Sequence, residues 1–570
     1  TGGAASGTTD ITCKVVGGSA TPSAAVKVTN YGAVAGGHVR VLVLSEQDGK
    51  PLSGAKVRVI DKSGAAQTDA VTGADGTVDV DCTGQTPPQA VHVFHADYNW
   101  VSVYTPGDSD LLISTSPNSD PDKVGGFRGK FDFSKIPNPG EVQLGIAGAS
   151  IPGNLINIDF TTLIGEMLTR HVKIGSLVDE EVPLPSGIVL TVSGENVKED
   201  YQPFGVAGPR VAWGIGGKVP IAEIIRILTP LLSGGTPDME SLAIGAILAK
   251  VMPFFDNFRH AINSSVTITD LDKVVDDGTT IKDPVGNPNG AANPDYNRDG
   301  ETTDLVANYQ SFPEVNLTLS QPLTARTSMT PPTLPKATNG SYLEGVIVIS
   351  GVMVPGRGLV PLGISAAVDA ANDEDVADGI IDTDPDTAGN QSKLELKLAP
   401  KHGGIESGKF VFIVLALSLD FGDDRSNQIS GFVVYPDVAT GLPASITLPP
   451  AFLGFATGTH STATRSFTVT NTDSAKTFIR AEFSGGEDKK WHVYFPGSGF
   501  ALPVPPAGMT DRAGADSDLS LIHVRLTTHG SGGFSDFMKF SSDNMIDMVS
   551  LAERFALTDC KNESGTITCN

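Results

Sequence analysis

The chain has 570 residues, of which 40% are hydrophobic and 18% are charged, and its formal net charge is −25. A chain of this length exceeds the size at which one hydrophobic core keeps growing, so we expect roughly three or four domains, and the apolar content argues against intrinsic disorder. The negative charge repels phosphate backbones and anionic lipid surfaces, which argues against nucleic acid as a partner. The 64 glycines and 38 prolines separate short apolar runs, as is typical of turn-rich β proteins.

The first 35 residues are rich in Gly, Ala and Ser and contain neither an initiator Met nor an apolar leader. We interpret residues 1–35 as the N-terminal tail of a mature, exported chain. No segment has the run of about twenty apolar residues that spans a bilayer, so the sequence predicts no transmembrane segment.

The four cysteines lie only near the two ends of the chain. Proximity along the chain predicts two local disulfides, Cys13–Cys82 and Cys560–Cys569, although four cysteines permit three pairings. Four buried thiols are the alternative. Disulfides form in oxidising compartments, so this interpretation agrees with an extracellular or cell-surface location.

Residues 36–105 contain short strands separated by turns with Gly or Pro. Apolar alternation predicts strands at residues 38–45, 56–60, 77–80 and 91–94. The turn Pro-Leu-Ser-Gly-Ala at 51–55 precedes the second strand, and Thr-Gly-Ala-Asp-Gly at 72–76 precedes the third. This order resembles the carboxypeptidase regulatory-like domain family, a transthyretin-like β-sandwich, with Asp97-Tyr98 in place of the family's final Gly-Tyr pair. The resemblance implies an accessory module of an exported protein that supports, spaces or binds and does not catalyse.

Residues 106–435 are interpreted as a large central β-rich domain with a few helices near 221–262. The segment at 345–349 and the apolar run at 410–419 predict buried strands. Two helices are predicted, at 221–232 and from Thr236 onward, since Thr-Pro-Asp is a helix start signal. We interpret them as an internal layer packed on a sheet, with a pocket for an apolar ligand as the alternative. The second helix would carry an apolar stripe of Ile244, Ile247, Leu248, Val251, Phe255, Phe258 and Ile262.

Residues 436–570 again show alternating apolar residues, at 467–470, 491–495 and 521–526. They predict a C-terminal β-sandwich closed by the Cys560–Cys569 loop. The expected fold class is therefore mainly β and multidomain, with an N-terminal transthyretin-like β-sandwich, a large central β-rich domain with a few helices and a C-terminal β-sandwich.

One acidic loop has oxygen-bearing side chains at alternate positions around Gly300. A hard cation such as calcium takes six to eight oxygen ligands, and the start of an EF-hand loop supplies them in this pattern. The final bidentate Glu of the full loop is missing, because Val306 stands there, and the loop is similar to the shortened calcium loops of dockerin and thrombospondin-type repeats. The alternative is a solvated acidic turn. The candidate calcium ligands are Asp295, Asn297, Asp299, Glu301 and Asp304.

A second acidic stretch is less regular and is a second candidate for calcium. Either ion would be structural, because it would fix a long loop without taking part in a reaction. The candidate ligands of this second loop are Asp369, Asn372, Asp373, Asp375 and Asp378.

Motifs that would identify an enzyme are absent from the sequence. It lacks the G-x-S-x-G nucleophile elbow, the H-E-x-x-H zinc helix, the phosphate-binding P-loop and the C-x-x-C-H haem motif. We therefore expect no nucleotide, no haem and no catalytic residue that sequence alone identifies.

Three functions remain as hypotheses. The first is a secreted or cell-surface structural or adhesive scaffold, stabilised by calcium, that self-associates or binds another extracellular component, with strand addition by the N-terminal tail as one route. The second is an exported hydrolase of polysaccharide or peptide with a carboxylate site in the central domain. The third is a carrier of lipid or another apolar ligand.

Overall fold

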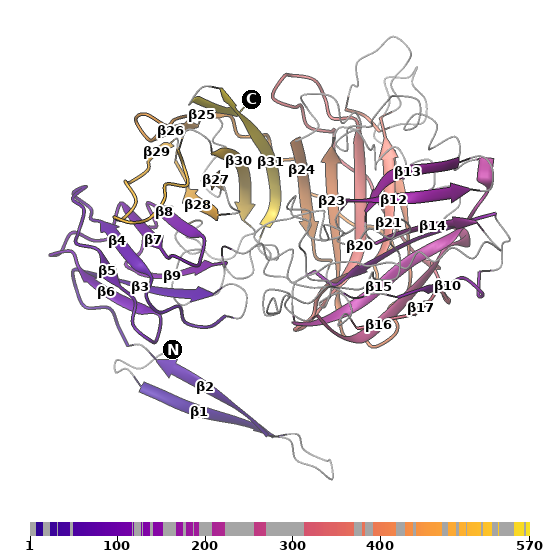
Figure 1. Cartoon of the computed structure of the whole chain (residues 1–570), viewed down its shortest axis with the longest axis horizontal. Coiled ribbons are helices and arrows are strands. Elements are labelled where there is room, and N and C mark those ends of the chain that lie inside the picture. The colour runs from indigo at the N-terminus through magenta and orange to yellow at the C-terminus, as the bar shows by residue number, and fades with distance from the viewer. Residues whose placement is uncertain are drawn as a thin grey trace, which may run out of the picture.

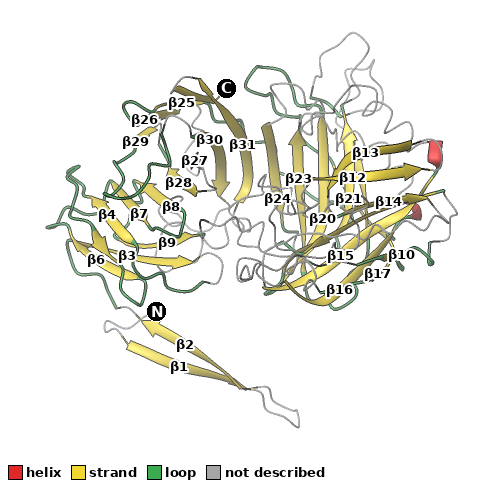
Figure 2. Ribbon diagram, viewed as in Figure 1, coloured by secondary structure: helices red, strands yellow, loops and turns green. Residues whose placement is uncertain are grey.

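The structure is a computed structural model, and almost all of its described part is β (Figure 2). Strands account for 55% of the described residues and helices for 2%. Among the residues described, no helix is long and apolar enough to cross a membrane. The described residues are 7–14, 23–30, 32–45, 49–116, 118, 127, 129–136, 141–151, 167–174, 178–185, 187–192, 208–222, 256–268, 313–369, 379–381, 392–417, 428–436, 441–469, 477–485, 489–497, 499–514, 517–526, 534, 552–563 and 566–569.

The N-terminal module is a sandwich of two small sheets, preceded by a two-stranded hairpin (Figure 1). Its first strand alternates Val39, Val41 and Val43 toward a core in which all three are fully buried. The module extends beyond residue 105, because its last strand pairs in parallel with its first. The hairpin is β1 (Gly7–Lys14) and β2 (Ser23–Asn30), the three-stranded sheet is β6 (Thr77–Asp81), β3 (His38–Ser45) and β9 (Asp110–Thr115), and the second sheet is β5 (Ala70–Val71), β4 (Lys56–Ile60), β7 (Ala90–Phe94) and β8 (Trp100–Tyr104).

The second sheet of the N-terminal module continues into the C-terminal and central regions, so that one sheet of 16 strands runs through all three. Beyond β8, the sheet continues first with strands of the C-terminal region and then with strands of the central region. Those strands are β28 (Lys489–Phe495), β27 (Thr477–Gly485), β30 (Asp518–Leu526), β31 (Ala552–Glu563), β24 (Gln428–Val434), β23 (Lys409–Leu417), β20 (Gly345–Val354) and β21 (Gly358–Val368), with β25 (Gly458–Ser461), β26 (Ser466–Val469), β29 (Gly499–Ala501) and β32 (Thr566–Cys569) attached at β31.

The central region forms a second sandwich, in which a five-stranded sheet packs on the far end of the long sheet. Trp213 and Phe412 lie in the same buried core, one from each sheet. The five-stranded sheet is β14 (Ile188–Val192), β11 (Val142–Ala149), β15 (Gly208–Val219), β16 (Arg259–Ile268) and β18 (Gln321–Pro322), and the remaining pairs are β12 (Met167–Ile174) with β13 (Val178–Pro185), β10 (Phe131–Asp132) with β17 (Leu317–Thr318), and β19 (Ala325–Met329) with β22 (Leu394–Leu398).

The predicted helix of the central region is wrong at its C-terminal end. Residues 259–268 form β16, which pairs with β15 along its length, so Ile262 lies in a strand. The segment Asn-Ser-Ser-Val-Thr-Ile at 263–268 contains β-branched residues and weak helix formers, and pairing with a neighbouring strand outweighs the apolar spacing. Residues 221–222 are helical, and residues 223–255, which carry the rest of both predicted helices, lie outside the described part.

Candidate functional site

The N-terminal and C-terminal modules meet along two parallel strands, β8 and β28. Trp491 faces Trp100 in the register, and Tyr494 faces Val103. These residues are about four hundred positions apart in sequence, so the pairing connects the two ends of the chain. We call this contact, made by residues 94–104, 489–495 and 512, the seam. It makes the β-sheet continuous between the two modules.

Three aromatic rings fill the seam. Trp100 and Trp491 have ring centroids 5.3 Å apart at an angle of 77°, and Phe94 lies 5.2 Å from the first and 5.8 Å from the second. These edge-to-face contacts are the favoured geometry for aromatic pairs and add about 0.5–1.5 kcal/mol each beyond the burial of their area. All three side chains are buried. The seam is therefore an apolar core shared by two modules.

Arg512 covers this aromatic group with a buried positive charge. Its guanidinium carbon lies 4.2 Å from the centroid of the Trp100 ring, and Nη1 donates hydrogen bonds to the carbonyls of Lys490 at 2.7 Å and Tyr98 at 3.2 Å. Burial lowers the pKa of Arg512 to about 10, so the group remains charged at neutral pH. One side chain thus binds backbone from both modules.

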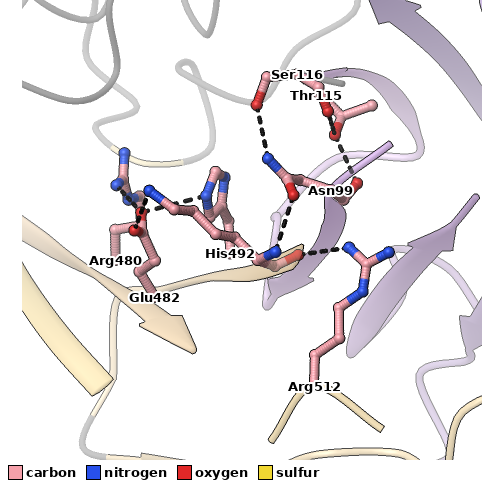
Figure 3. A network of polar contacts seen from close by, with 8 residues as sticks. Asn99, Thr115, Ser116, Arg480, Glu482, His492 and Arg512 are labelled. Atoms are coloured by element: carbon pink, nitrogen blue, oxygen red, sulfur yellow. Dashed lines mark hydrogen bonds and ion pairs between the residues drawn. The ribbon is translucent and has the colours of Figure 1, made fainter. Parts of the chain in front are cut away.

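Asn99 satisfies backbone groups on both sides of the seam (Figure 3). Its Oδ1 accepts a hydrogen bond from the backbone N–H of Lys490 at 2.9 Å, and its Nδ2 donates to Ser116 at 3.0 Å. The carbonyl of Asn99 accepts from the Thr115 hydroxyl at 2.6 Å. Because these groups are buried or partly buried, the hydrogen bonds of Asn99 replace bonds that water would otherwise supply.

Ser102 connects two buried side chains across the same seam. Trp491 Nε1 donates to its hydroxyl oxygen at 2.9 Å, and His92 Nδ1 lies 2.8 Å from that oxygen. The indole N–H can only donate, so the Ser102 oxygen accepts from Trp491, and the tautomer of His92 sets the direction of the hydrogen bond between Ser102 and His92 Nδ1. Burial, together with the charge of Arg58, lowers the pKa of His92 to about 3, so the ring is neutral.

A buried carboxylate lies beside the seam, between β27 and β28. Glu482 Oε2 is 2.5 Å from Arg480 Nη2 and 3.2 Å from His492 Nε2, and its Oε1 is 3.1 Å from Lys490 Nζ. Burial opposes ionisation of Glu482, but Arg480, His492 and Lys490 outweigh it and hold the pKa of Glu482 well below its usual value. Burial also lowers the pKa of His492. A carboxylate held ionised by several donors positions its neighbours and is a poor general acid.

The loop at 499–513 supports the seam from outside. Arg465 makes a bidentate ion pair with Asp511, and its guanidinium lies 5.8 Å from the Trp491 ring. Tyr104 donates from its hydroxyl to the carbonyl of Ala501 at 2.6 Å, and Arg58 donates to the carbonyl of Val504 at 2.7 Å. The N-terminal module is thus also fixed by backbone carbonyls of this loop.

The predicted calcium ligands are mostly outside the described residues. This holds for the whole first loop, Asp295, Asn297, Asp299, Glu301 and Asp304, and for Asn372, Asp373, Asp375 and Asp378 of the second. The carboxylate of Asp369 accepts a hydrogen bond from the backbone N–H of Gly379 at 2.9 Å, which closes the base of the second loop. Within the described ranges, no three His, Cys, Asp or Glu residues are placed to hold a metal ion together. Calcium binding stays a prediction.

One of the two predicted disulfides is formed. Cys560 and Cys569 are bonded, and they join β31 to β32. Cys82 is a free thiol, so the Cys13–Cys82 bridge is not formed in this structure. Cys13 lies on β1, which pairs with β2 in a separate hairpin, whereas Cys82 lies in the buried core of the N-terminal module, with its sulfur 3.7 Å from the carbonyl of Val80 and the pKa of its thiol raised by burial.

The seam residues were not among the sequence-predicted site residues. A signal was present, since Arg480 and Glu482 are two positions apart on one strand and therefore share a face with His492 opposite. Two of the three tryptophans, Trp100 and Trp491, also lie at the start of the apolar part of their strands. Nothing in either segment identifies the other as its partner, because both read as ordinary half-buried strands.

Comparisons with known proteins give no family for this chain. No family model matches, and no curated protein matches. Among solved structures, the shaft pilin SpaA from Lactobacillus rhamnosus GG aligns with 11% identity over 32% of this chain and 88% of that chain, with a TM-score of 0.12. The Bacillus anthracis TIE protein aligns with 10% identity over 71% and 52%, and the Bacillus cereus major pilin subunit BcpA with 7% over 72% and 97%, both with a TM-score of 0.13. Superpositions this loose carry no argument about fold or function.

Proposed function

We propose that this protein is a structural or adhesive scaffold of the extracellular space or cell surface, which self-associates or binds another surface component. The observation that carries the proposal is the seam. It joins the two ends of the chain through strand pairing, three packed aromatic rings and a buried arginine. A β-sheet that continues across the junction resists bending between modules, which is the mechanical property that a scaffold needs.

The chemistry of the buried polar groups supports the same proposal. Arg512 and Asn99 bind backbone groups, and Glu482 is paired with surrounding cations. Arg512 and Asn99 connect the N-terminal and C-terminal modules, and the Glu482 cluster stabilises the C-terminal side of the seam. The Cys560–Cys569 disulfide supports an oxidising, extracellular location. Calcium at the two acidic loops belongs to the proposal as a second means of rigidity.

Assembly of the purified chain tests the proposal. Sedimentation velocity over a hundredfold range of concentration, with and without calcium, should show association of the full chain that increases with concentration. A chain in which residues 1–30 are replaced by a Gly-Ser linker of equal length tests whether the N-terminal segment supplies the contact. If the full chain stays monomeric under all conditions and binds no isolated surface polymer, the scaffold proposal is wrong.

A further inference from the structure

A pair of histidines in the central sandwich offers chemistry that the seam and the scaffold proposal do not use. His260 lies on β16, and His402 lies in the loop between β22 and β23. The two rings are nearly perpendicular, at 86°, and His260 Nδ1 is 2.9 Å from His402 Nε2. On its other side, His260 Nε2 is 2.9 Å from the carbonyl of Pro361. The two imidazole nitrogens therefore face each other across a hydrogen bond.

The hydrogen bonds fix which nitrogen of His260 is available. A carbonyl only accepts, so His260 Nε2 carries the proton that is donated to Pro361. The neutral ring then has its lone pair on Nδ1, directed at His402. In this state His402 Nε2 carries the single proton between the two rings. If that proton moves to Nδ1 of His402, the ring stays neutral and both converging nitrogens present lone pairs.

The loop is built to hold His402 in this position. Gly403 and Gly404 have φ of +67° and +94°, a region that other residues rarely adopt. A Cβ on Gly403 would lie 3.2 Å from Ile262, and one on Gly404 would lie 2.7 Å from the Oγ of Ser264. The loop backbone thus rests directly on β16, where a side chain would not fit, and this contact brings His402 to His260.

Other contacts close the same loop on itself. Lys401 Nζ donates to the carbonyl of Gly408 at 2.6 Å and lies 4.3 Å from the centroid of the Phe410 ring. The ammonium group is therefore already bound to the loop. Glu406 is exposed on the same turn and acts on His402 as a nearby negative charge. Glu406 therefore offsets the positive charge of Lys401 on the same loop.

We propose that His260 and His402 form a binding site for a divalent transition-metal ion of the Cu²⁺ or Zn²⁺ class, with His260 Nδ1 and His402 Nε2 as its protein ligands. Imidazole nitrogens suit both ions, and copper binds such sites more tightly than zinc. Ligand distances of about 2.0–2.1 Å in a tetrahedral site place two nitrogens about 3.3 Å apart. The observed 2.9 Å needs a small outward shift of His402, which is on a loop.

The surroundings complete the requirements of such a site. A metal-binding histidine almost always donates its second N–H to a carbonyl or carboxylate, as His260 does to Pro361. His402 is half-buried and Glu406 on the same turn is exposed, so the His402 side of the pair lies near the protein surface.

The test is titration of the full chain with CuSO₄ or ZnCl₂ alone, followed by calorimetry and, for copper, by electron paramagnetic resonance. Three proteins are compared, namely wild type, His402→Gln and, as the matched control, His95→Gln, which removes a histidine of the N-terminal module. Gln at 402 retains a donor for His260, and circular dichroism of the metal-free proteins checks the fold.

We expect wild type and H95Q to bind copper with the hyperfine pattern of two nitrogen ligands and to melt at a higher temperature with one equivalent of copper. H402Q should bind at least about tenfold more weakly, lose one nitrogen from the pattern and show no rise in melting temperature. If H402Q, correctly folded, binds copper and zinc as wild type does, or if wild type shows no two-nitrogen site, the proposal is overturned. Neither result bears on the scaffold proposal.

Discussion

Replacing Arg512 with Ala removes the only side chain of the seam that combines a cation–π contact with hydrogen bonds to two separate backbone segments. The guanidinium lies 4.2 Å from the Trp100 ring and donates to the carbonyls of Lys490 and Tyr98. Removing it exposes the ring face and leaves two partly buried carbonyls without this donor. The variant should therefore weaken the contact between the N-terminal and C-terminal modules.

The magnitude follows from these contacts. A hydrogen bond from a charged donor contributes about 1.5–3 kcal/mol, and a desolvated cation–π contact about 2 kcal/mol. Burial of the charge offsets part of this, because it lowers the pKa of Arg512 from 12.5 to about 10, and each pKa unit corresponds to about 1.4 kcal/mol. We therefore expect a net loss of about 3 kcal/mol in the free energy of unfolding of the seam.

The assay is urea unfolding followed by tryptophan fluorescence in a Trp213→Phe background. The remaining tryptophans, Trp100 and Trp491, both lie in the seam and report on it directly. Arg326→Ala is the matched control, because Arg326 is partly exposed and pairs at 3.5 Å with the exposed Asp256, a contact that contributes about 0–1 kcal/mol. Equal unfolding midpoints for R512A and R326A would refute the account of the seam.

Three further predictions concern other parts of the molecule. The fold lowers the pKa of His92 to about 3, whereas the unfolded chain binds this proton near pH 6.5. The free energy of unfolding should therefore be greatest above pH 6.5 and fall by up to about 5 kcal/mol as the pH decreases to 3. In an acid titration, the His92→Gln variant should show a weaker dependence of stability on pH. Replacing Cys560 and Cys569 together with Ser should lower stability by about 2–3 kcal/mol in urea unfolding, and an unchanged midpoint would contradict this. Gly404→Ala should cost about 1–3 kcal/mol, more than Gly356→Ala in open space, as measured by thermal unfolding.

Local pattern was sufficient to predict many strands. The alternation at residues 38–45, 56–60, 77–80 and 91–94 predicted β3, β4, β6 and β7, and the same holds for β28 and β30 at the other end of the chain. This prediction succeeds because alternating apolar residues in a Val-rich segment lie on one face only when the segment is a β-strand. The mainly β fold class is therefore confirmed.

The error in the helix ending at Ile262 shows where pattern is ambiguous. Apolar residues at helical spacing continue through Phe258 and Ile262, but the following segment pairs with β15 and forms a strand. The spacing of apolar residues within one segment carries no information about its partner strand, β15, which begins some fifty residues earlier at Gly208. Tertiary pairing here outweighs local preference.

The seam could not be predicted from the sequence either, because its two strands pair across an even longer separation along the chain. β8 and β28 are paired although hundreds of residues separate them, and each resembles an ordinary half-buried strand. Charged residues such as Arg480 and Glu482 read as solvent-exposed in isolation. Only the fold shows that they neutralise one another in the interior. For the same reason, the sequence alone does not bring His260 and His402 together.

Hydrogen exchange of the full chain, followed by mass spectrometry, tests most directly whether the two ends of the protein form one folded unit. The account predicts that peptides covering 100–104 and 491–494 are protected as strongly as those of β27, and that R512A lowers the protection of both together. If the β8 and β28 peptides exchange at the rate of exposed loops while the rest of each module stays protected, the modules are separate bodies and the central claim is wrong.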